Sequence, residues 1–511
     1  MIGNGLQFAG PRYRLLRWFC LVGEKAGLET QRLIVPGLHP AILISDPALV
    51  DFVLARPHIF TKGDDFKLKT KPFLGHGIFN SEGALWRKER KAGAQFLSSQ
   101  QLRHMVDENL TRCWATMRND LNQAVAAGSM VDLQYLFLSA TTKTMGDMAF
   151  NADLDPASDY CRDFEFANGV VATRAQDPLW AVREFLSHPN PFTTSKIIKS
   201  FETVRYMSYQ LVETALYGKA AKTLREKGGF GAQPSPIPAL GDTGAVERKT
   251  FIHHLAEQIS DTQTIAEVAI TFLIAGRDTT AQGLTWTMWT LLRNPHVIQR
   301  MRSELAPLKQ ADGSLDLSFD NLHPSVIPYI MAVFYEALRL FPPVPLELKE
   351  TEHAVTLPDG THLPPQRLVI WCLWSMGRSK QIWGPDAANF NPDRWLEDEH
   401  IGEEAQGRSE TNGEIYGVQK KTKKVFLPRS QGEYPVFNGG PRLCLGKRMA
   451  EVQACYFLAN LVWNYDFAEV LEGPDKGYLY FGGGEKRGER MCRISLTLPM
   501  EGGLPCYVRK L

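Results

Sequence analysis

The spacing of apolar and polar residues predicts a mainly helical chain, with strands concentrated near its two ends and after a pair of prolines. An apolar run at 41–45 predicts a strand, and the pattern at 46–54 predicts the helix that follows it. The clearest helix lies at 261–295, where apolar residues recur with helical spacing over about 33 residues, or roughly 50 Å at 1.5 Å per residue. Few globular proteins need a helix of that length.

Two polar segments and several shorter elements complete the pattern. The Gly- and Pro-rich stretch at 228–244 predicts an exposed connection, and the lysine-rich region at 396–433 predicts a solvated loop. The other predicted elements are a helix at about 325–340 that two prolines end, strands at 354–357 and 367–372 joined by a turn, a helix at 449–465, and strands at 495–498 and 506–508. The predicted fold class is mainly α with smaller β regions, an α+β chain.

The composition is that of a folded globular protein, and it excludes several other classes of protein. The chain has 511 residues, 44% of them hydrophobic and 22% charged, which excludes a disordered chain, collagen and a small disulfide scaffold. Lys and Arg number 57 against 56 Asp and Glu, a formal net charge of +1. Nucleic acid is therefore not an expected partner, because no overall positive field draws phosphate to the surface.

The cysteines and the hydropathy pattern indicate the compartment. Eight cysteines are scattered without a CxxC pair, so neither a zinc site nor a dense disulfide framework is indicated, and a reducing compartment is expected. No run of about 18 apolar residues occurs, and charges interrupt residues 1–28, so this segment is not expected to span a bilayer or to act as a signal peptide. The chain is expected to be soluble or at most peripheral to a membrane.

The strongest chemical motif is the loop FNGGPRLCLG at 437–446, which a helical pattern follows at once. Its glycines and proline predict a rigid turn, and the start of the next helix would point backbone N–H groups at the sulfur of Cys444. Such a position lowers the pKa of a thiol and favours a thiolate that can bind a metal. Taken alone, a cysteine near a helix start is more often a small buried apolar residue.

This loop resembles the haem-binding loop of the cytochrome P450 family, because five of its positions match the pattern FxxGxRxCxG. The matching residues are Phe437, Gly440, Arg442, Cys444 and Gly446. The resemblance implies that Cys444 is the axial ligand of the iron in haem b, and that Phe437, Arg442 and Gly446 contact the same cofactor. It spans most of the chain, from about residue 86 onward.

A second motif, AGRDTT at 275–280, lies in the middle of the long predicted helix. Glycine there costs about 1 kcal/mol relative to alanine and so needs a reason. The missing side chain of Gly276 would let a ligand approach the backbone, with Thr279 facing that ligand and Asp278 relaying protons; the alternative is a Gly/Thr kink packed against another helix. The resemblance implies haem contacts for Ala275 and Gly276. Some animal fatty-acid hydroxylases esterify haem through a glutamate at the position of Ala275, so haem here should be non-covalent apart from the sulfur–iron bond.

A third motif pairs Glu336 with Arg339, three residues apart on one face of a predicted helix. Such spacing is usually a surface ion pair worth a few tenths of a kcal/mol. In the family this pair joins an arginine from a later loop, for which Arg394 in PDRW is the counterpart. The resemblance therefore implies a buried charged network with a structural role and no part in the reaction.

The fourth motif places Trp86 and Arg90 one helical turn apart in WRKER. The resemblance implies that both contact the haem propionates together with Arg442. Arginine suits carboxylates because its planar fork donates two parallel hydrogen bonds. Many relatives place a further Arg or His after the double proline, and this chain offers Lys349 at about that place.

The resemblance implies a single cytochrome P450 domain over residues 1–511, with the long helix over the haem and the cysteine loop beneath it. An N-terminal β-rich part would comprise about 30–80 together with 341–372. A helical core would comprise about 81–340 together with 434–466.

The implied activity is that of a haem-thiolate monooxygenase. A thiolate ligand favours cleavage of bound O2, so that a C–H bond of the substrate is hydroxylated. The two electrons would come from NADPH through NADPH–cytochrome P450 reductase, with cytochrome b5 as a further donor. Lys88, Lys91, Lys447, Arg448 and the lysines at 420–424 would form a basic patch for an acidic redox partner, and ordinary solvated lysines are the alternative.

The substrate is expected to be lipophilic, because the residues expected to line the pocket are apolar. These residues are Phe272, Val344, Leu346 and Met500. The strings AGRDTTA, LGHGIFNSEGALWRKER and FNGGPRLCLG look most like those of the eukaryotic (fungal or plant) alkane and fatty-acid hydroxylases. This resemblance favours a fatty acid or an alkane as the substrate.

Two other functions fit the same motifs. A haem-thiolate isomerase or dehydratase would rearrange lipid hydroperoxides without a reductase, although it needs no proton-delivering Thr279. A haem sensor or carrier would only hold its ligand. The resemblance also implies the cytosolic face of the endoplasmic reticulum membrane, and the chain begins roughly where the anchor helix of membrane-bound members would end.

Overall fold

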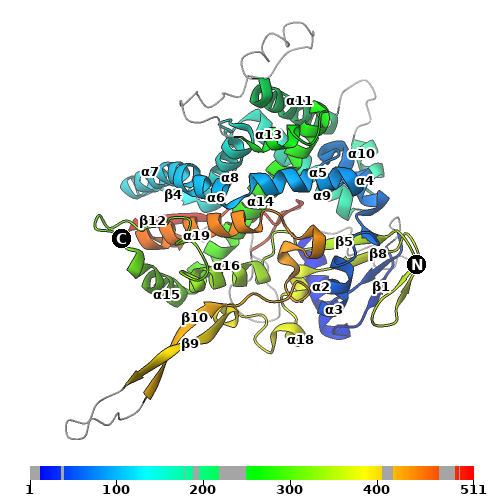
Figure 1. The fold of residues 1–511 in the computed structure, drawn as a ribbon. Helices are drawn as coiled ribbons and strands as arrows, with labels where there is room; N and C mark the ends of the chain where they lie inside the picture. The colour runs from blue at the N-terminus through cyan, green and yellow to red at the C-terminus, as the bar shows by residue number, and fades with distance from the viewer. Residues whose placement is uncertain are drawn as a thin grey trace, which may run out of the picture.

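Helices form most of the molecule, and the longest of them, α14 (Thr262–Arg293), crosses its centre (Figure 1). Asp261 caps α14 by accepting a hydrogen bond from the Thr264 amide at 2.9 Å, and Pro295 begins the next helix. The predicted helix at 261–295 is therefore confirmed. The computed structural model describes residues 12–35, 39–177, 179–187, 195–217, 249–405, 418–470, 490–493 and 495–511.

Several helices surround α14 and position the loops that follow them. Helices that pack directly on α14 include α8 (Leu133–Phe150), α11 (Lys196–Tyr217), α16 (Pro328–Leu340) and α19 (Lys447–Asn464). The predicted helices at 325–340 and 449–465 correspond to α16 and α19. The other helices are α2 (Arg12–Ala26), α3 (Pro47–Leu54), α4 (Gly63–Leu74), α5 (Gly83–Phe96), α6 (Ser99–His104), α7 (Thr111–Ala127), α9 (Asp159–Gln176), α10 (Trp180–Ser187), α13 (Phe251–Ala256), α15 (Pro295–Leu305), α17 (Leu373–Met376) and α18 (Lys380–Trp383).

One five-stranded sheet joins the N-terminal part of the chain to the segment after the double proline. Its strands, in spatial order, are β1 (Gln31–Leu33), β2 (Ala41–Leu43), β8 (Leu368–Trp371), β5 (Glu347–Thr351) and β3 (Phe60–Thr61). Strand β2 runs parallel to β8, and the other pairs are antiparallel. The predicted turn after 354–357 leads instead to a short hairpin of β6 (Val355–Thr356) and β7 (His362–Leu363), which leaves β8 in the large sheet.

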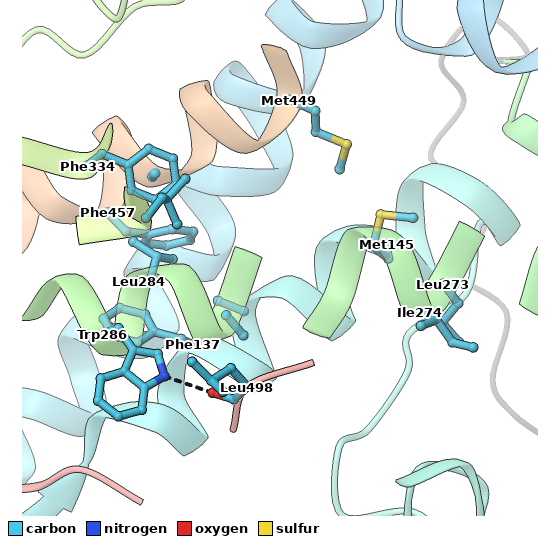
Figure 2. Close-up of a cluster of buried hydrophobic side chains, with 14 of the residues drawn as sticks. Phe137, Met145, Leu273, Ile274, Leu284, Trp286, Phe334, Met449, Phe457 and Leu498 are labelled. Carbon is cyan, nitrogen blue, oxygen red and sulfur yellow. Dashed lines mark hydrogen bonds between the residues drawn. The ribbon is translucent and has the colours of Figure 1, made fainter. Parts of the chain in front are cut away.

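A second sheet lies near the C-terminus. It consists of β11 (Tyr465–Glu469), β12 (Pro505–Lys510) and β4 (Met130–Asp132). The predicted strand at 506–508 lies in β12, but the strand predicted at 495–498 is wrong. There the Leu498 carbonyl accepts a hydrogen bond from the Trp286 indole at 2.8 Å instead of pairing with a neighbouring strand (Figure 2).

A long hairpin replaces the solvated loop predicted at 396–433. Strand β9 (Leu396–Ala405) pairs antiparallel with β10 (Val418–Phe426), and Figure 1 shows the hairpin projecting from the body of the molecule. Opposite charges face each other across the strands, as in the Lys424–Asp398 ion pair at 3.0 Å, and such pairs stabilise a sheet without an apolar face. The predicted connection at 228–244 lies outside the described residues.

Aromatic side chains fill the core between α14 and its neighbours. The rings of Trp286 and Phe341 stack with centroids 4.5 Å apart, and Figure 2 shows Phe334 and Phe457 in the same cluster. The predicted α+β class, mainly helical with small sheets, is confirmed. Within the described ranges, no helix has the length and apolar character needed to cross a membrane.

Candidate active site

The cysteine loop is a tight turn between the core and α19. Its ends are joined by a hydrogen bond from the Cys444 amide to the Phe437 carbonyl at 2.7 Å. Asn438 and Gly440 both have left-handed backbone angles, with φ of 59° and 56°. A Cβ on Gly440 would lie 2.3 Å from the carbonyl oxygen of Leu54, at the end of α3, so only glycine fits there.

The side chain of Cys444 keeps accessible surface, and its sulfur is at the same time surrounded closely by protein atoms. Burial raises the pKa of the Cys444 thiol, and the Gly446 amide with the charges of Arg90 and Lys447 offsets only part of the rise. The prediction that the helix start alone lowers the pKa of this thiol is wrong, because desolvation outweighs it. A metal bound to the sulfur reverses this balance, since a coordinating thiol is deprotonated outright.

One face of α14 keeps accessible surface in the middle of the helix. Between 268 and 291 every residue is buried except Ala275, Gly276 and Thr279, which lie within one helical turn on one side. The Thr279 hydroxyl donates a hydrogen bond to the Ala275 carbonyl at 2.6 Å. Ala275 and Thr279 thus present a small, partly polar surface of the kind predicted to face a ligand.

Gly276 has a packing role that the ligand-based interpretation missed. A Cβ on Gly276 would lie 2.3 Å from the sulfur of Met145 on α8, and Figure 2 shows Met145 beside α14. The haem contact expected of Gly276 stays a prediction. Close packing of another helix, the alternative considered for this motif, accounts for the missing side chain.

Asp278 lies in a buried network on a neighbouring face of α14. It accepts hydrogen bonds from Arg277 Nη1 at 2.7 Å and from Asn168 Nδ2 at 2.8 Å. Arg277 also donates to Glu165 and to the Thr142 hydroxyl, both at 2.7 Å. Burial raises the pKa of Asp278, and the nearby Arg277 offsets only part of the rise. Neither Asn168 nor Glu165 was identified from the sequence, because both lie on a helix far away in the chain.

The residues predicted to bind propionates lie close together. The guanidinium of Arg442 stacks on the Trp86 ring at 4.3 Å, and Arg90 donates to the Leu443 carbonyl at 2.5 Å. Burial lowers the pKa of both arginines. Arg442 also pairs with Glu82, a partner that the sequence did not indicate.

Two further ionisable groups are buried beside Arg442. Lys349 on β5 is 5% exposed, and burial lowers its pKa to about 7. Glu89 on α5 is fully buried and accepts a hydrogen bond from Ser81, and burial raises its pKa to about 8. Glu89 was missed because a glutamate among charged neighbours in WRKER is typical of a solvated helix face.

Glu336 is the fully buried centre of an ion network, in which the Arg394 side chain keeps 9% exposure. Its carboxylate accepts hydrogen bonds from Arg339 at 2.7 and 2.8 Å and from Arg394 at 3.0 Å. The Trp395 indole and the Asn391 amide also donate to it, at 2.9 and 2.8 Å. The structure thus brings together the three residues that the resemblance grouped, and it places them in the core.

The four predicted pocket residues separate into two groups. Val344 and Leu346 keep partial exposure, as expected of residues beside a ligand. The ring of Phe272 lies 3.8 Å from that of Phe251. Because residue 272 shares one face of α14 with Gly276 and Thr279, its place in the pocket stays a prediction.

Met500 is held through its backbone, and its place in the pocket stays a prediction. It is fully buried, and its backbone exchanges hydrogen bonds with the Gln134 side chain at 2.7 and 3.1 Å. Its position next to α8 is therefore structural, since the segment that carries it is fixed to the start of that helix.

The described residues fit a haem. Cys444 would supply a thiolate ligand to the iron, and Ala275 and Thr279 would face the cofactor from α14. Arg90 and Arg442 would offer cations to its carboxylates. This donor set and the helical fold together define a haem-thiolate protein.

Comparison with known proteins identifies the family. A model of the family described as cytochrome P450 matches residues 32–476, so the chain belongs to the cytochrome P450 family, and it is a monooxygenase. It is 27% identical to cytochrome P450 94A1 of Vicia sativa over 523 aligned residues, which cover 100% of this chain and 89% of that relative. Cytochrome P450 94B1 of Arabidopsis thaliana is 28% identical, and the alignment covers 92% of this chain and 85% of that relative. Cytochrome P450 704B1 of the same plant is also 28% identical, and the alignment covers 85% of this chain and 82% of that relative. The predicted family is thereby confirmed.

Proposed function

We propose that this monooxygenase hydroxylates a C–H bond of a fatty acid or an alkane, using O2 and two electrons from NADPH delivered by NADPH–cytochrome P450 reductase, with cytochrome b5 as a further donor. The observation that carries the proposal is the cysteine loop, closed by the bond between Cys444 and Phe437, in a chain whose central helix exposes Ala275 and Thr279. The proposed location is the cytosolic face of the endoplasmic reticulum membrane.

Each site residue has a defined task in this proposal. Haem, when bound, supplies oxygen activation at an iron that a thiolate ligates. Cys444 holds the iron, and Trp86, Arg90 and Arg442 hold the propionates. Because the Thr279 hydroxyl donates to the Ala275 carbonyl at 2.6 Å, its oxygen is oriented to accept a hydrogen bond from the ligand side.

Proton supply falls to Asp278. Burial raises its pKa, which favours a carboxyl group that takes up a proton and releases it again. The carboxyl group must leave Arg277 or Asn168 to reach the face that carries Thr279, so the transfer requires a side-chain rotation.

The partner and substrate surfaces follow from exposed charge and apolar lining. Lys88 and Lys91 on α5 are exposed, and α5 is joined to the cysteine loop by the bond between Arg90 and Leu443. An acidic reductase would be attracted to this surface. Val344 and Leu346 give the pocket apolar, partly exposed side chains, which suit an aliphatic chain.

The experiment is a reconstitution of the haem-loaded protein with reductase and NADPH. Saturated fatty acids and n-alkanes of matched chain length are supplied separately, and products are identified by mass spectrometry. A hydroxylated product that requires NADPH supports the proposal, and the substrate that gives it identifies the class. Turnover of a lipid hydroperoxide without NADPH would establish the isomerase or dehydratase instead. Ligand binding without product in either assay would indicate a haem sensor.

The role of Thr279 can be tested against a matched threonine on the same helix. We expect Thr279→Ala to keep the carbon monoxide spectrum of a thiolate-ligated haem and to lower product per NADPH at least about tenfold, with peroxide released, since a positioned proton donor contributes ~100-fold or more. The control is Thr287→Ala, which removes an equivalent bond to the Gly283 carbonyl at 2.7 Å. Equal coupling in the two variants would contradict the assigned role.

A further inference from the structure

Tyr335 on α16 is a buried phenol to which the proposed function gives no task. It is 2% exposed, and its hydroxyl donates a hydrogen bond to Glu451 Oε1 on α19 at 2.6 Å. Burial and the charge of Glu451 raise the pKa of Tyr335, so the phenol keeps its proton in the resting protein. A carboxylate oxygen is therefore in direct contact with the proton that this phenol can lose.

Contacts join Tyr335 to the cysteine loop. Its ring centroid lies 5.7 Å from that of Phe437, and the Phe437 carbonyl accepts the hydrogen bond from the Cys444 amide at 2.7 Å. Glu451 is close enough to Cys444 for its charge to raise the pKa of the thiol. The phenol, its carboxylate partner and the residue that would hold the iron thus form one connected group.

Lys447 restricts the way in which Tyr335 can lose an electron. Its ammonium lies 5.9 Å from the centroid of the Tyr335 ring and 5.6 Å from that of the Phe437 ring. A positive charge at that distance disfavours a phenol radical cation, because like charges repel strongly in a buried site. Transfer of the proton to Glu451 leaves a neutral radical, so the electron and the proton should leave the phenol together.

A neighbouring tyrosine shows what is particular to Tyr335. The Tyr434 ring stacks on that of Tyr335 with centroids 5.2 Å apart, but the Tyr434 hydroxyl donates to the Tyr335 backbone carbonyl at 3.1 Å. A carbonyl oxygen is a far weaker base than a carboxylate. The two oxygens of Glu451 also have separate partners, since Oε2 lies 3.6 Å from Arg448 Nη1 and leaves Oε1 to the phenol.

We propose that Tyr335 is a redox-active residue, which gives one electron to the haem site and its phenolic proton to Glu451 when hydrogen peroxide oxidises that site in the absence of substrate. The O–H bond of Tyr335 breaks, and an O–H bond forms on Oε1 of Glu451. A neutral tyrosyl radical and a neutral carboxyl group remain, and one electron has passed to the haem site. A one-electron reductant such as ascorbate returns the electron, and the carboxyl group returns the proton.

The pair gives the protein a protective function besides hydroxylation. An oxidising equivalent that moves to Tyr335 no longer reaches the sulfur of Cys444, whose thiolate is open to irreversible oxidation. This function requires bound haem and peroxide, but it requires neither reductase, nor NADPH, nor substrate.

The experiment mixes the ferric, haem-loaded protein with hydrogen peroxide, freezes it within milliseconds and records its electron paramagnetic resonance spectrum. Unlabelled protein is compared with protein made from ring-deuterated tyrosine. We expect a radical signal whose splitting changes with the label. Absence of a radical, or a signal that the label leaves unchanged, would overturn the proposal.

The residue is identified by Tyr335→Phe, which keeps the ring and removes the hydroxyl. The matched control is Tyr434→Phe, in the same aromatic cluster but without a carboxylate partner. The carbon monoxide spectrum verifies the thiolate-ligated haem in each variant. We expect loss of the tyrosyl signal only in Tyr335→Phe. A signal that persists in Tyr335→Phe, or that is lost equally in Tyr434→Phe, would overturn the assignment to Tyr335.

The proton acceptor is tested by Glu451→Gln, which keeps the shape of the side chain but cannot take up the proton at neutral pH. We expect this variant to lose the tyrosyl signal and its haem absorbance to bleach faster under peroxide than that of the unsubstituted protein. An unchanged signal and an unchanged bleaching rate would show that Glu451 does not accept the proton.

These readouts are independent of the proposed hydroxylation. A protein that forms the hydroxylated product but no tyrosyl radical would refute this inference alone. A protein that forms the radical but no NADPH-dependent product from a fatty acid or an alkane would refute the proposed function alone.

Discussion

Burial determines the protonation state of the charged side chains around the cysteine loop. Glu89 and Lys349 both interact with the charge of Arg442, and burial raises the pKa of the acid to about 8 and lowers that of the base to about 7. Both groups are therefore shifted toward their neutral forms near neutral pH. The positive charge available to a carboxylate ligand then rests mainly on Arg90 and Arg442.

This shift predicts a pH-dependent gain from Glu89→Gln. A glutamate with a pKa of about 8 when folded and an ordinary value of 4.5 stabilises the fold fully below 4.5, and this contribution is lost as pH rises to 8. The free energy of unfolding of the variant should therefore equal that of the unsubstituted protein near pH 4.5. Near pH 7 it should be higher by about 3 kcal/mol. Urea unfolding at both pH values measures the difference.

The control for this titration is Glu202→Gln, made on an exposed side chain of α11. Its free energy of unfolding should differ from that of the unsubstituted protein by the same amount at both pH values. A Glu89→Gln effect of equal size at both pH values would mean that lost packing or lost hydrogen bonding, and not ionisation, explains it.

The Glu336 network predicts a large effect from one substitution. Glu336→Ala leaves Arg339 and Arg394 buried without their carboxylate, and breaking a buried ion network in this way costs about 3–5 kcal/mol. Asp320→Ala, which removes an exposed pair with Arg103, should change the free energy of unfolding far less, because solvent screens that pair. Chemical unfolding of both variants compares them, and similar losses would show that burial adds nothing to the network.

At the scale of elements, the cysteine loop depends on a contact with α3 that lies far away in the sequence. Gly440 has a left-handed backbone conformation, and a Cβ at this position would clash with the Leu54 carbonyl at the end of that helix. Gly446, by contrast, has an ordinary φ of −84° and no atom within 4 Å of an added Cβ. The two glycines of the motif therefore serve different purposes.

This contrast predicts opposite behaviour for two alanine variants. Gly440→Ala should lower the free energy of unfolding by about 2 kcal/mol or more, through its backbone angle and its clash with Leu54. Gly446→Ala should leave the unfolding of the haem-free protein almost unchanged and lower the affinity for haem. Haem titration and urea unfolding separate the two effects, and a large loss of stability from Gly446→Ala would contradict the distinction.

Sequence patterns predicted the elements whose evidence is local. The helix at 261–295 and the loop around Cys444 were predicted because their periodicity, caps and glycines lie within a few turns. The hairpin of β9 and β10 was missed because its stability comes from charges paired across strands. The side of α14 that faces a ligand could not be predicted from its pattern alone, because a helix buried on almost every side has no polar face.

At the scale of the whole molecule, exposed lysines near the cysteine loop form the surface at which the proposed reductase would dock. Lys88 and Lys91 are exposed on α5, whereas Lys447 places its ammonium 5.6 Å above the Phe437 ring and is partly buried. Lys423 and Lys424 are also exposed, so Lys447 is the only partly buried lysine among the described lysines of the predicted basic patch. Side chains at 420 and 421 lie outside the described residues.

This surface predicts a salt-dependent loss on charge reversal. Replacing both Lys88 and Lys91 by Glu should slow reduction by the reductase about tenfold at low ionic strength, with the deficit shrinking as salt screens the surface. Lys510→Glu, on an exposed residue of the C-terminal strand, should change little. Stopped-flow reduction under carbon monoxide measures the rate, and a deficit independent of salt would exclude electrostatic steering.

The five-stranded sheet can form only late in synthesis, because it pairs strands from distant parts of the chain. Strand β2 (Ala41–Leu43) needs β8 (Leu368–Trp371), and β3 (Phe60–Thr61) needs β5 (Glu347–Thr351), so the earliest strands wait for most of the chain to be synthesised. Nascent chains that stop before β5 therefore present unpaired strand edges to chaperones and to one another. Translation speed through the intervening helices should influence the yield of soluble protein.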